Sequence, residues 1–188
     1  MINRNRRGVA FFGGSFDPPH QGHSKIVSKA IECLDIDLVL VVPTYQNPLK
    51  QTSFASANQR LEWCREVFSD EKTTVSSYEI DNHIQYTAET LRYFEGIYEV
   101  RYLIIGADNL KTLKQWHDFE WLNSHIIWAI VTRGNIPLEV EALNSWVILP
   151  IADETSSTHI RTTNDVSRVD QKIAPLVKKT LEKGKNNK

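Results

Sequence analysis

The sequence predicts an α/β protein built on a doubly wound, mostly parallel sheet, and two kinds of pattern carry this prediction. Short runs of almost continuous apolarity recur along the chain, which is typical of strands buried on both faces. Segments with helical periodicity separate these runs. The alternation of strand and helix indicates a sheet with helices on both faces.

Apolar runs rich in β-branched and aromatic residues are the expected strands. They are Val9–Phe12, Leu38–Val42, Val100–Ile105, Ile126–Thr132 and Trp146–Leu149. In such sheets ligands bind beyond the carboxyl ends of the strands, near the point where the strand order reverses. The residues that follow these runs are therefore the first candidates for a functional site.

Helices are expected where apolar residues recur three and four positions apart, since such residues form one face of a helix. These residues are Ile26, Val27, Ala30, Ile31 and Leu34 in one segment and Leu61, Cys64, Val67 and Phe68 in another. A further helix is expected to begin near Thr155. The basic, polar tail Lys178–Lys188 is expected to fray at its last residues.

Composition favours one ordinary globular domain, residues 1–188. The hydrophobic fraction is 41% and the formal net charge is −1, so no basic field indicates a nucleic-acid or membrane partner. No run approaches the ~20 apolar residues of a membrane helix. Cys33 and Cys64 lack Cys-x-x-Cys spacing and lie in apolar helical contexts, which predicts buried thiols in a cytoplasmic protein. The oligomeric state stays open, and a homo-oligomer is compatible with the sequence.

The strongest functional signal is the segment Gly13–His23, Gly-Gly-Ser-Phe-Asp-Pro-Pro-His-Gln-Gly-His, directly after the first expected strand. Gly13 and Gly14 allow a sharp turn and a close approach of the backbone to a ligand. His20 and His23 share one face at the start of a helix, where unpaired N–H groups and the helix dipole attract phosphate. The spacing matches neither Gly-x-Gly-x-x-Gly nor the P-loop. It predicts a site for a nucleoside triphosphate.

This segment also admits two other interpretations. A plain strand-to-helix turn capped by Asp17 would leave two surface histidines, but the joint placement of these features after a first strand is uncommon. A metal site on His20 and His23 would need a third ligand, and none is evident nearby. We expect the two imidazoles to stabilise charge on the transferring phosphorus and the leaving pyrophosphate.

A second motif, Thr155–Arg161, follows the last expected strand and reads Thr-Ser-Ser-Thr-His-Ile-Arg. Hydroxyl groups at a helix N-cap, with N–H groups behind them, can form an anion pocket. Arg161 lies one turn inside the expected helix, where a guanidinium can reach a phosphate. Alone, the segment also fits an ordinary cap with a solvated arginine. Its pairing with the first motif favours a second phosphate pocket.

Together the two motifs resemble the nucleotidyltransferase superfamily of the HxGH type, and across almost the whole chain its bacterial nicotinate-nucleotide adenylyltransferases. The resemblance implies a Rossmann-like nucleotidyltransferase fold and a reaction of NAD biosynthesis, in which AMP passes from ATP to nicotinate mononucleotide, giving deamido-NAD and pyrophosphate. It implies Mg²⁺ that comes with ATP. The expected catalytic residues are His20, His23 and Arg161; the expected ATP-binding residues are Gly13, Gly14, Ser15, Phe16, His20, His23, Gly106, Asp108, Ser156, Ser157, Thr158 and Arg161.

Other segments resemble the family's acceptor site. Residues 43–50 resemble Pro-x-x-x-x-Pro-His-Lys, with Leu49 in place of the histidine, and residues 86–91 resemble the segment whose threonine recognises the nicotinate carboxylate. Residues 105–116 resemble the segment in which an aspartate meets the ribose and a tryptophan stacks on the pyridine ring. Arg60 resembles the family's usual arginine in the helix after the first of these loops. The expected substrate-binding residues are Lys50, Tyr86, Thr87, Asp108 and Trp116.

Alternatives to these assignments stay open at this point. Trp116 could be core packing, and Thr87 could be only a helix cap. A sibling adenylyltransferase that acts on nicotinamide mononucleotide or phosphopantetheine would share both phosphate motifs, although Thr87 and Trp116 together suit a carboxylated aromatic ring. A catalytically silent nucleotide-binding module on the same fold is the remaining alternative. No role is assigned to His83, His117 or His125, and Arg133, after an expected strand, is a candidate to face the ATP phosphates.

Overall fold

The computed structural model describes residues 6–46, 53–132, 138–153 and 155–186, and its sheet has six strands in the order β3-β2-β1-β4-β5-β6. All neighbouring strands are parallel. The strands are β1 (Gly8–Gly14), β2 (Leu38–Pro43), β3 (Thr73–Val75), β4 (Glu99–Gly106), β5 (Ile127–Thr132) and β6 (Trp146–Pro150). The order reverses between β1 and β4, which confirms the predicted doubly wound α/β sheet.

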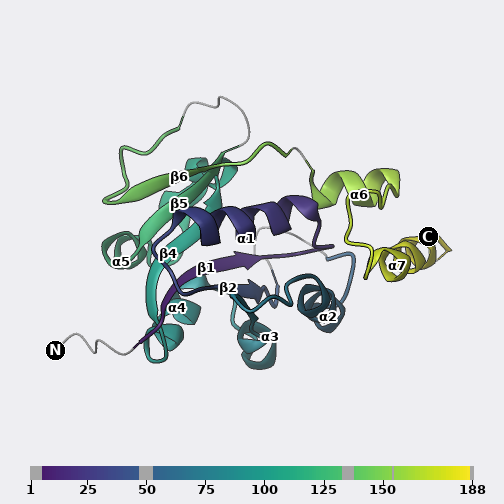
Figure 1. The fold of residues 1–188 in the computed structure, drawn as a ribbon, viewed down its shortest axis with the longest axis horizontal. Coiled ribbons are helices and arrows are strands. Elements are labelled where there is room, and N and C mark those ends of the chain that lie inside the picture. Colours follow the sequence, from purple (N-terminus) through teal and green to yellow (C-terminus); the bar gives the residue numbers. More distant parts are fainter. Residues whose placement is uncertain (1–5, 47–52, 133–137, 154, 187–188) are drawn as a thin grey trace.

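Helices cover both faces of this sheet (Figure 1). They are α1 (Gln21–Cys33), α2 (Ala57–Val67), α3 (Tyr78–Asn82), α4 (Thr87–Glu95), the 3₁₀ helix η1 (Ala107–Gln115), α5 (Phe119–His125), α6 (Ser157–Thr163) and α7 (Ala174–Asn186). Successive side chains of a strand point to opposite faces. Val9 and Phe11 of β1 therefore pack with α4, η1 and α5, whereas Ala10 and Phe12 pack with α1 and α2.

The expected burial of the strands is confirmed for the centre of the sheet and wrong for β6. Every residue of β2 is buried, as are the first five of β1. In β6, Trp146 and Ile148 are 42% and 44% exposed, because β6 is an edge strand with a neighbour on one side only. The other edge strand, β3, was not predicted, because Thr73–Val75 is short and lacks apolar alternation.

A third hydrophobic cluster attaches the C-terminal helices to α2. It joins Trp63 of α2 to Ile160 of α6 and to Val177 and Leu181 of α7. The tail is helical as far as Asn186, because one apolar face of α7 is buried. Residues 187–188 lie outside the described ranges.

The two cysteines differ in environment. Cys64 is buried, as expected, but Cys33 is exposed at the last residue of α1, so that part of the expectation is wrong. Both are free thiols. Within the ranges that the structure describes, none of the helices has the length and apolarity to cross a bilayer.

Candidate active site

The first predicted motif forms the end of β1 and the start of α1. Gly13 and Gly14 close β1, and the N–H of Thr44 donates to the Gly14 carbonyl at 2.9 Å. His20 is the N-cap of α1 and His23 lies in its first turn, with 3.8 Å between their ring centroids. The His20 N–H donates to Nδ1 of His23 at 3.2 Å, so a neutral His23 carries its proton on Nε2. The predicted histidine pair is therefore formed at the N-terminus of a 13-residue helix.

The Phe16 ring packs against the histidine pair on its side toward the core. Its ring is 2% exposed and meets the His23 ring edge-on, with 5.0 Å between centroids. Its φ of 45° is unusual for a residue with a side chain, and a backbone of this kind persists where the surroundings hold it. Phe12 and Phe68 supply that packing. Phe16, expected to bind ATP, thus has its side chain in the core, where it positions His23.

Asp17 joins this loop to the segment that precedes α2. Its carboxylate accepts the N–H groups of Phe54 at 2.7 Å and Ala55 at 3.0 Å. It does not cap α1, because His20 occupies the N-cap position. The alternative of a plain turn capped by Asp17 is therefore not what the chain forms.

The second motif lies directly on this loop (Figure 1). A hydroxyl cap was predicted in this segment, and Ser156 supplies it: Ser156 is the N-cap of α6, and its hydroxyl accepts the His159 N–H at 3.1 Å. The Ser157 hydroxyl donates to the Pro18 carbonyl at 2.9 Å, and Arg161 donates to the Asp17 carbonyl at 2.6 Å and to Thr158 at 3.1 Å. The two predicted phosphate motifs, which are remote in the sequence, are thus in contact.

An ion pair that the sequence did not predict holds the two motifs together. Nζ of Lys25, in α1, lies 2.6 Å from Oδ2 of Asp153, and Oδ1 of Asp153 accepts the Thr155 N–H at 2.8 Å. Burial alone would raise the pKa of Asp153, but the hydrogen bonds from Lys25 and Thr155 hold it well below its usual range. The sequence could not predict this pair, because Lys25 and Asp153 lie 128 positions apart and neither belongs to a recognised motif.

Gly106 and Asp108 extend the site along the same edge of the sheet. Phe11 of β1 is level with Leu103 of β4, so Gly14 and Gly106 each follow three residues later. Gly106 ends β4 and precedes η1, and a Cβ there would collide with Oδ1 of Asp108. The glycine is therefore needed for the exposed Asp108 carboxylate to fold back over the end of the strand.

Tyr86 and Thr87 lie at the start of α4, and Trp116 directly follows η1. Tyr86 is the N-cap of α4, so Thr87, its first residue, is not a cap. The Tyr86 ring stacks on His117 with 4.6 Å between centroids, which brings the start of α4 against the end of η1. Trp116 is half-buried against the core and meets Trp128 edge-on at 6.4 Å. His117, to which the sequence analysis assigned no role, thus contacts one of the predicted acceptor residues.

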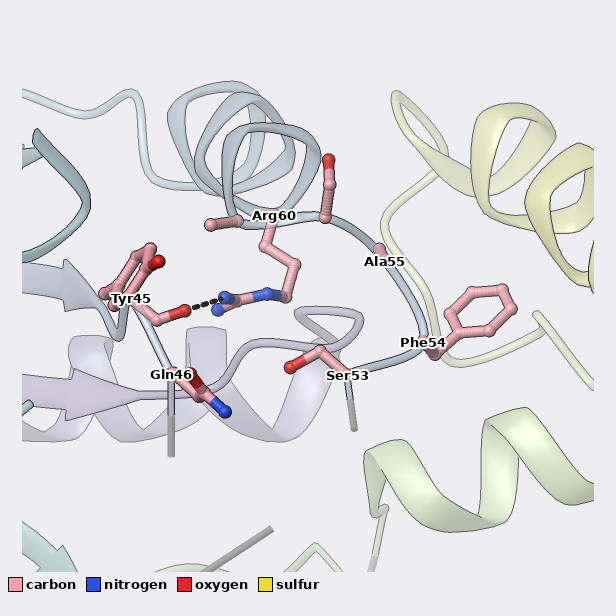
Figure 2. Close-up of a pocket in the computed structure, with 8 residues that line it drawn as sticks. Tyr45, Gln46, Ser53, Phe54, Ala55 and Arg60 are labelled. Atoms are coloured by element: carbon pink, nitrogen blue, oxygen red, sulfur yellow. Dashed lines mark hydrogen bonds between the residues drawn. The ribbon is translucent and has the colours of Figure 1, made fainter. Parts of the chain in front are cut away.

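Arg60 of α2 binds the backbone that follows β1 and the backbone that follows β2. It is 1% exposed and donates to the carbonyls of Ser15 at 2.7 Å, Thr44 at 2.7 Å and Tyr45 at 3.1 Å. Figure 2 shows its guanidinium reaching the Tyr45 backbone at the wall of a pocket of about 320 Å³. Burial lowers the pKa of Arg60, but a guanidinium keeps its charge in proteins. Arg60 is therefore a structural cation that ties β1 to β2.

Some predicted residues lie outside the described ranges: Lys50, Leu49 and Arg133. Among the residues that are described, no three or more histidine, cysteine or acidic side chains gather into a group that could hold a metal ion.

Fold and site together define a nucleotidyltransferase. Residues 11–163 match the family model described as cytidylyltransferase-like. A Sulfurovum sp. (strain NBC37-1) protein named "probable nicotinate-nucleotide adenylyltransferase" is 49% identical over 184 residues, 97% of this chain and 98% of that one. A protein of the same name from Campylobacter jejuni (strain RM1221) is 37% identical over 183 residues, 95% of this chain and 99% of that one. The chain belongs to the nicotinate-nucleotide adenylyltransferase family.

Solved structures show the same fold. Plasmodium falciparum nicotinic acid mononucleotide adenylyltransferase, complexed with NaAD, has a TM-score of 0.72 and 18% identity, over 95% of this chain and 96% of that one. The same enzyme complexed with APC has a TM-score of 0.69 with equal identity and coverage. At this identity the likeness concerns the fold alone.

Proposed function

We propose that this chain transfers AMP from ATP to nicotinate mononucleotide and releases deamido-NAD and pyrophosphate, a step of NAD biosynthesis. The contact between the two phosphate motifs carries the proposal. Ser157 and Arg161 bond to the β1–α1 loop beside His20 and His23, so donors and cations from both ends of the chain converge at the switch point of the sheet. The names of the relatives support the choice of acceptor.

The reaction needs no nucleophilic side chain. A phosphate oxygen of nicotinate mononucleotide attacks the α-phosphorus of ATP, a new P–O bond forms, and the bond to the bridging oxygen of pyrophosphate breaks. Because both reactants are anions, the barrier lies in bringing them together and in stabilising the charge on the leaving group. Positioning and electrostatic stabilisation are the means by which a protein lowers such a barrier.

In this proposal, the phosphate motifs divide the work. His20 and His23 face the α-phosphate and the leaving pyrophosphate, while Ser157, Thr158 and Arg161 face the β- and γ-phosphates. A guanidinium has five N–H donors. Arg161 can therefore keep its contacts to Asp17 and Thr158 and still donate to a phosphate.

The acceptor takes the other half of the site in the same proposal. Thr87 and the N–H groups at the start of α4 would receive the nicotinate carboxylate, and Trp116 would stack on the pyridine ring beside Tyr86. Asp108 would accept from ribose hydroxyl groups. Lys50 would add a positive charge near the acceptor phosphate.

Mg²⁺ enters this proposal bound to ATP. A hard cation of this kind prefers oxygen ligands, which the triphosphate and water supply, and it would neutralise part of the phosphate charge. The chain's own residues then orient the two nucleotides. The proposal sets the reaction in the cytoplasm, where free thiols such as Cys33 and Cys64 stay reduced.

The test is pyrophosphate release from ATP and Mg²⁺ with nicotinate mononucleotide, nicotinamide mononucleotide or phosphopantetheine in separate reactions. We expect release with the first and much less with the others. If no acceptor leads to pyrophosphate release, the result would favour the catalytically silent module. A preference for nicotinamide mononucleotide would contradict the carboxylate pocket at Thr87, and a preference for phosphopantetheine would also remove the stacking role of Trp116.

A further inference from the structure

Arg60 and Thr90 lie in segments that resemble the family, yet neither has a part in the proposed transfer. The structure turns both toward one buried carboxyl group, Glu79 of α3. The Thr90 hydroxyl donates to Oε1 of Glu79 at 2.8 Å, and Arg60 acts on Glu79 through its charge. Thr90 is fully buried, Glu79 is 3% exposed and Arg60 is 1% exposed. Thr90 thus serves a carboxylate inside the protein and not the substrate.

The contacts of Glu79, Arg60 and Thr90 reach three segments of the proposed site. Glu79 accepts the backbone N–H of Tyr45, and Arg60 donates to the carbonyl of the same residue. Arg60 also bonds Ser15, the residue after Gly14. Thr90 lies one helical turn beyond the proposed carboxylate-binding residue of α4. The phosphate loop, the end of β2 and the start of α4 are therefore connected through two buried groups, the Arg60 guanidinium and the Glu79 carboxyl group.

The charge state of Glu79 depends on pH in the physiological range. Burial raises the pKa of Glu79 to about 7, although the hydrogen bonds from Thr90 and Tyr45 and the charge of Arg60 oppose that rise. The other titratable groups around the network are Asp17 and Cys64, which act on Arg60, and His83, whose ring packs edge-on against Tyr45. Charge-assisted hydrogen bonds are about twice as strong as neutral ones. The ionised carboxylate therefore holds its partners more firmly than the protonated one.

We infer that Glu79 is a positioning residue for the transfer: its ionised carboxylate, opposite Arg60, fixes the Tyr45 backbone and the first turns of α4 relative to the phosphate loop. Glu79 touches no substrate. Protonation turns one of its two acceptor oxygens into a donor and weakens the network. The inference rests on the proposed function, because it concerns the geometry in which the two nucleotides meet.

The test compares kcat/KM for nicotinate mononucleotide in the wild type and in Glu79→Gln between pH 6 and pH 8.5. Glutamine resembles the protonated side chain at every pH. The ratio of variant to wild type should be near 1 at pH 6 and should fall about tenfold at pH 8.5, since only the wild-type residue ionises. Titration of the substrates cancels in this ratio.

Glu62→Gln is the matched control, because Glu62 is an exposed carboxylate of α2 that pairs with Arg65. Its ratio to the wild type should stay near 1 at every pH. A ratio for Glu79→Gln that does not change with pH would overturn the inference while leaving the proposed function intact. A wild-type protein that releases no pyrophosphate would instead overturn the proposed function.

A second pair of variants keeps the test decisive if Glu79→Gln does not fold. Thr90→Val removes the hydroxyl that lowers the pKa of Glu79, so the acidic limb of the kcat/KM profile should move to higher pH. Thr90→Ser keeps the hydroxyl and should restore the wild-type profile. Identical profiles for the valine and serine variants would contradict the inference.

Discussion

At the scale of single residues, the site depends on side chains that hold other side chains in place. His23 is set by the Phe16 ring and by the N–H of His20, and Asp108 depends on the absence of a Cβ at Gly106. These supports are distinct from the groups proposed to meet substrate. A substitution at His23 can therefore separate catalysis from folding.

We predict that His23→Ala lowers kcat by about 10² to 10³-fold, as expected when one group that stabilises transition-state charge is removed. The change in unfolding free energy should be small, about 1 kcal/mol, because the ring is only half-buried and its Nδ1 accepts the backbone N–H of His20, a hydrogen bond of ordinary strength. Steady-state kinetics and urea unfolding measure the two effects. His125→Ala, at an exposed histidine of α5, is the control and should keep full activity. A His23→Ala protein that is fully active, or merely unfolded, would contradict this prediction.

At the scale of elements, α6 is short and is held in position by what it touches. Its cap and its contacts to Asp17 and Pro18 are supplemented by the ion pair between Lys25 of α1 and Asp153. Asp153 is 3% exposed at its side chain and Lys25 is 48% exposed, so the carboxylate is the member of the pair that depends on its partner. A buried charge that loses its partner is destabilising.

We predict that Lys25→Met destabilises the protein by about 1 to 2 kcal/mol at pH 7 and raises KM for ATP, because the buried Asp153 carboxylate then loses its cation and keeps only neutral hydrogen bonds such as those from Thr155. The folded pKa of Asp153 is depressed, so its stabilising effect is present above the unfolded pKa and is lost as pH falls toward the folded value. The difference between variant and wild type should therefore shrink below about pH 4.

Urea unfolding at pH 7 and at pH 3 measures this difference. Lys29→Met on the same helix is the control, because its partner Glu32 lies at an exposed i,i+3 position, and it should change neither quantity measurably. Equal effects of the Lys25 and Lys29 variants would show that the ion pair does not hold the second motif.

At the scale of the whole molecule, the network around Glu79 links stability to pH across several elements. The folded pKa of Glu79 is raised to about 7, so the unfolded chain loses this proton at lower pH than the folded one. Its favourable contribution is full below the unfolded pKa, about 4.5, and is lost as pH rises to about 7. Ionisation of Glu79 thus favours the positioned site and disfavours the fold.

We predict that Glu79→Gln removes this dependence. Its unfolding free energy relative to the wild type should rise between pH 4.5 and pH 7.5 by on the order of 2–3 kcal/mol. Chemical denaturation across this range measures the change without any substrate. A constant difference between the two proteins would mean that the carboxyl group titrates alike in the folded and unfolded chain.

Much of the architecture could be predicted because it depends on neighbours in the sequence. Apolar runs marked five of the strands, and the Ser156 cap and the His20–His23 pair followed from local spacing. The exposed face of β6 and the helical tail could not be predicted in this way. The exposure of β6 and the helix of the tail each depend on which other element packs against that segment. A local sequence pattern carries no information about such packing.

The sequence by itself determined the class of fold and the strand-to-helix turn at Gly13, and it predicted the phosphate chemistry of both motifs, since periodicity, glycine geometry and capping act over a few residues. Only the tertiary structure decided that the motifs touch, that Lys25 pairs with a residue 128 positions away, and that Arg60 and Thr90 serve a buried carboxyl group. The physical reason is that burial and charge compensation are properties of the packed chain.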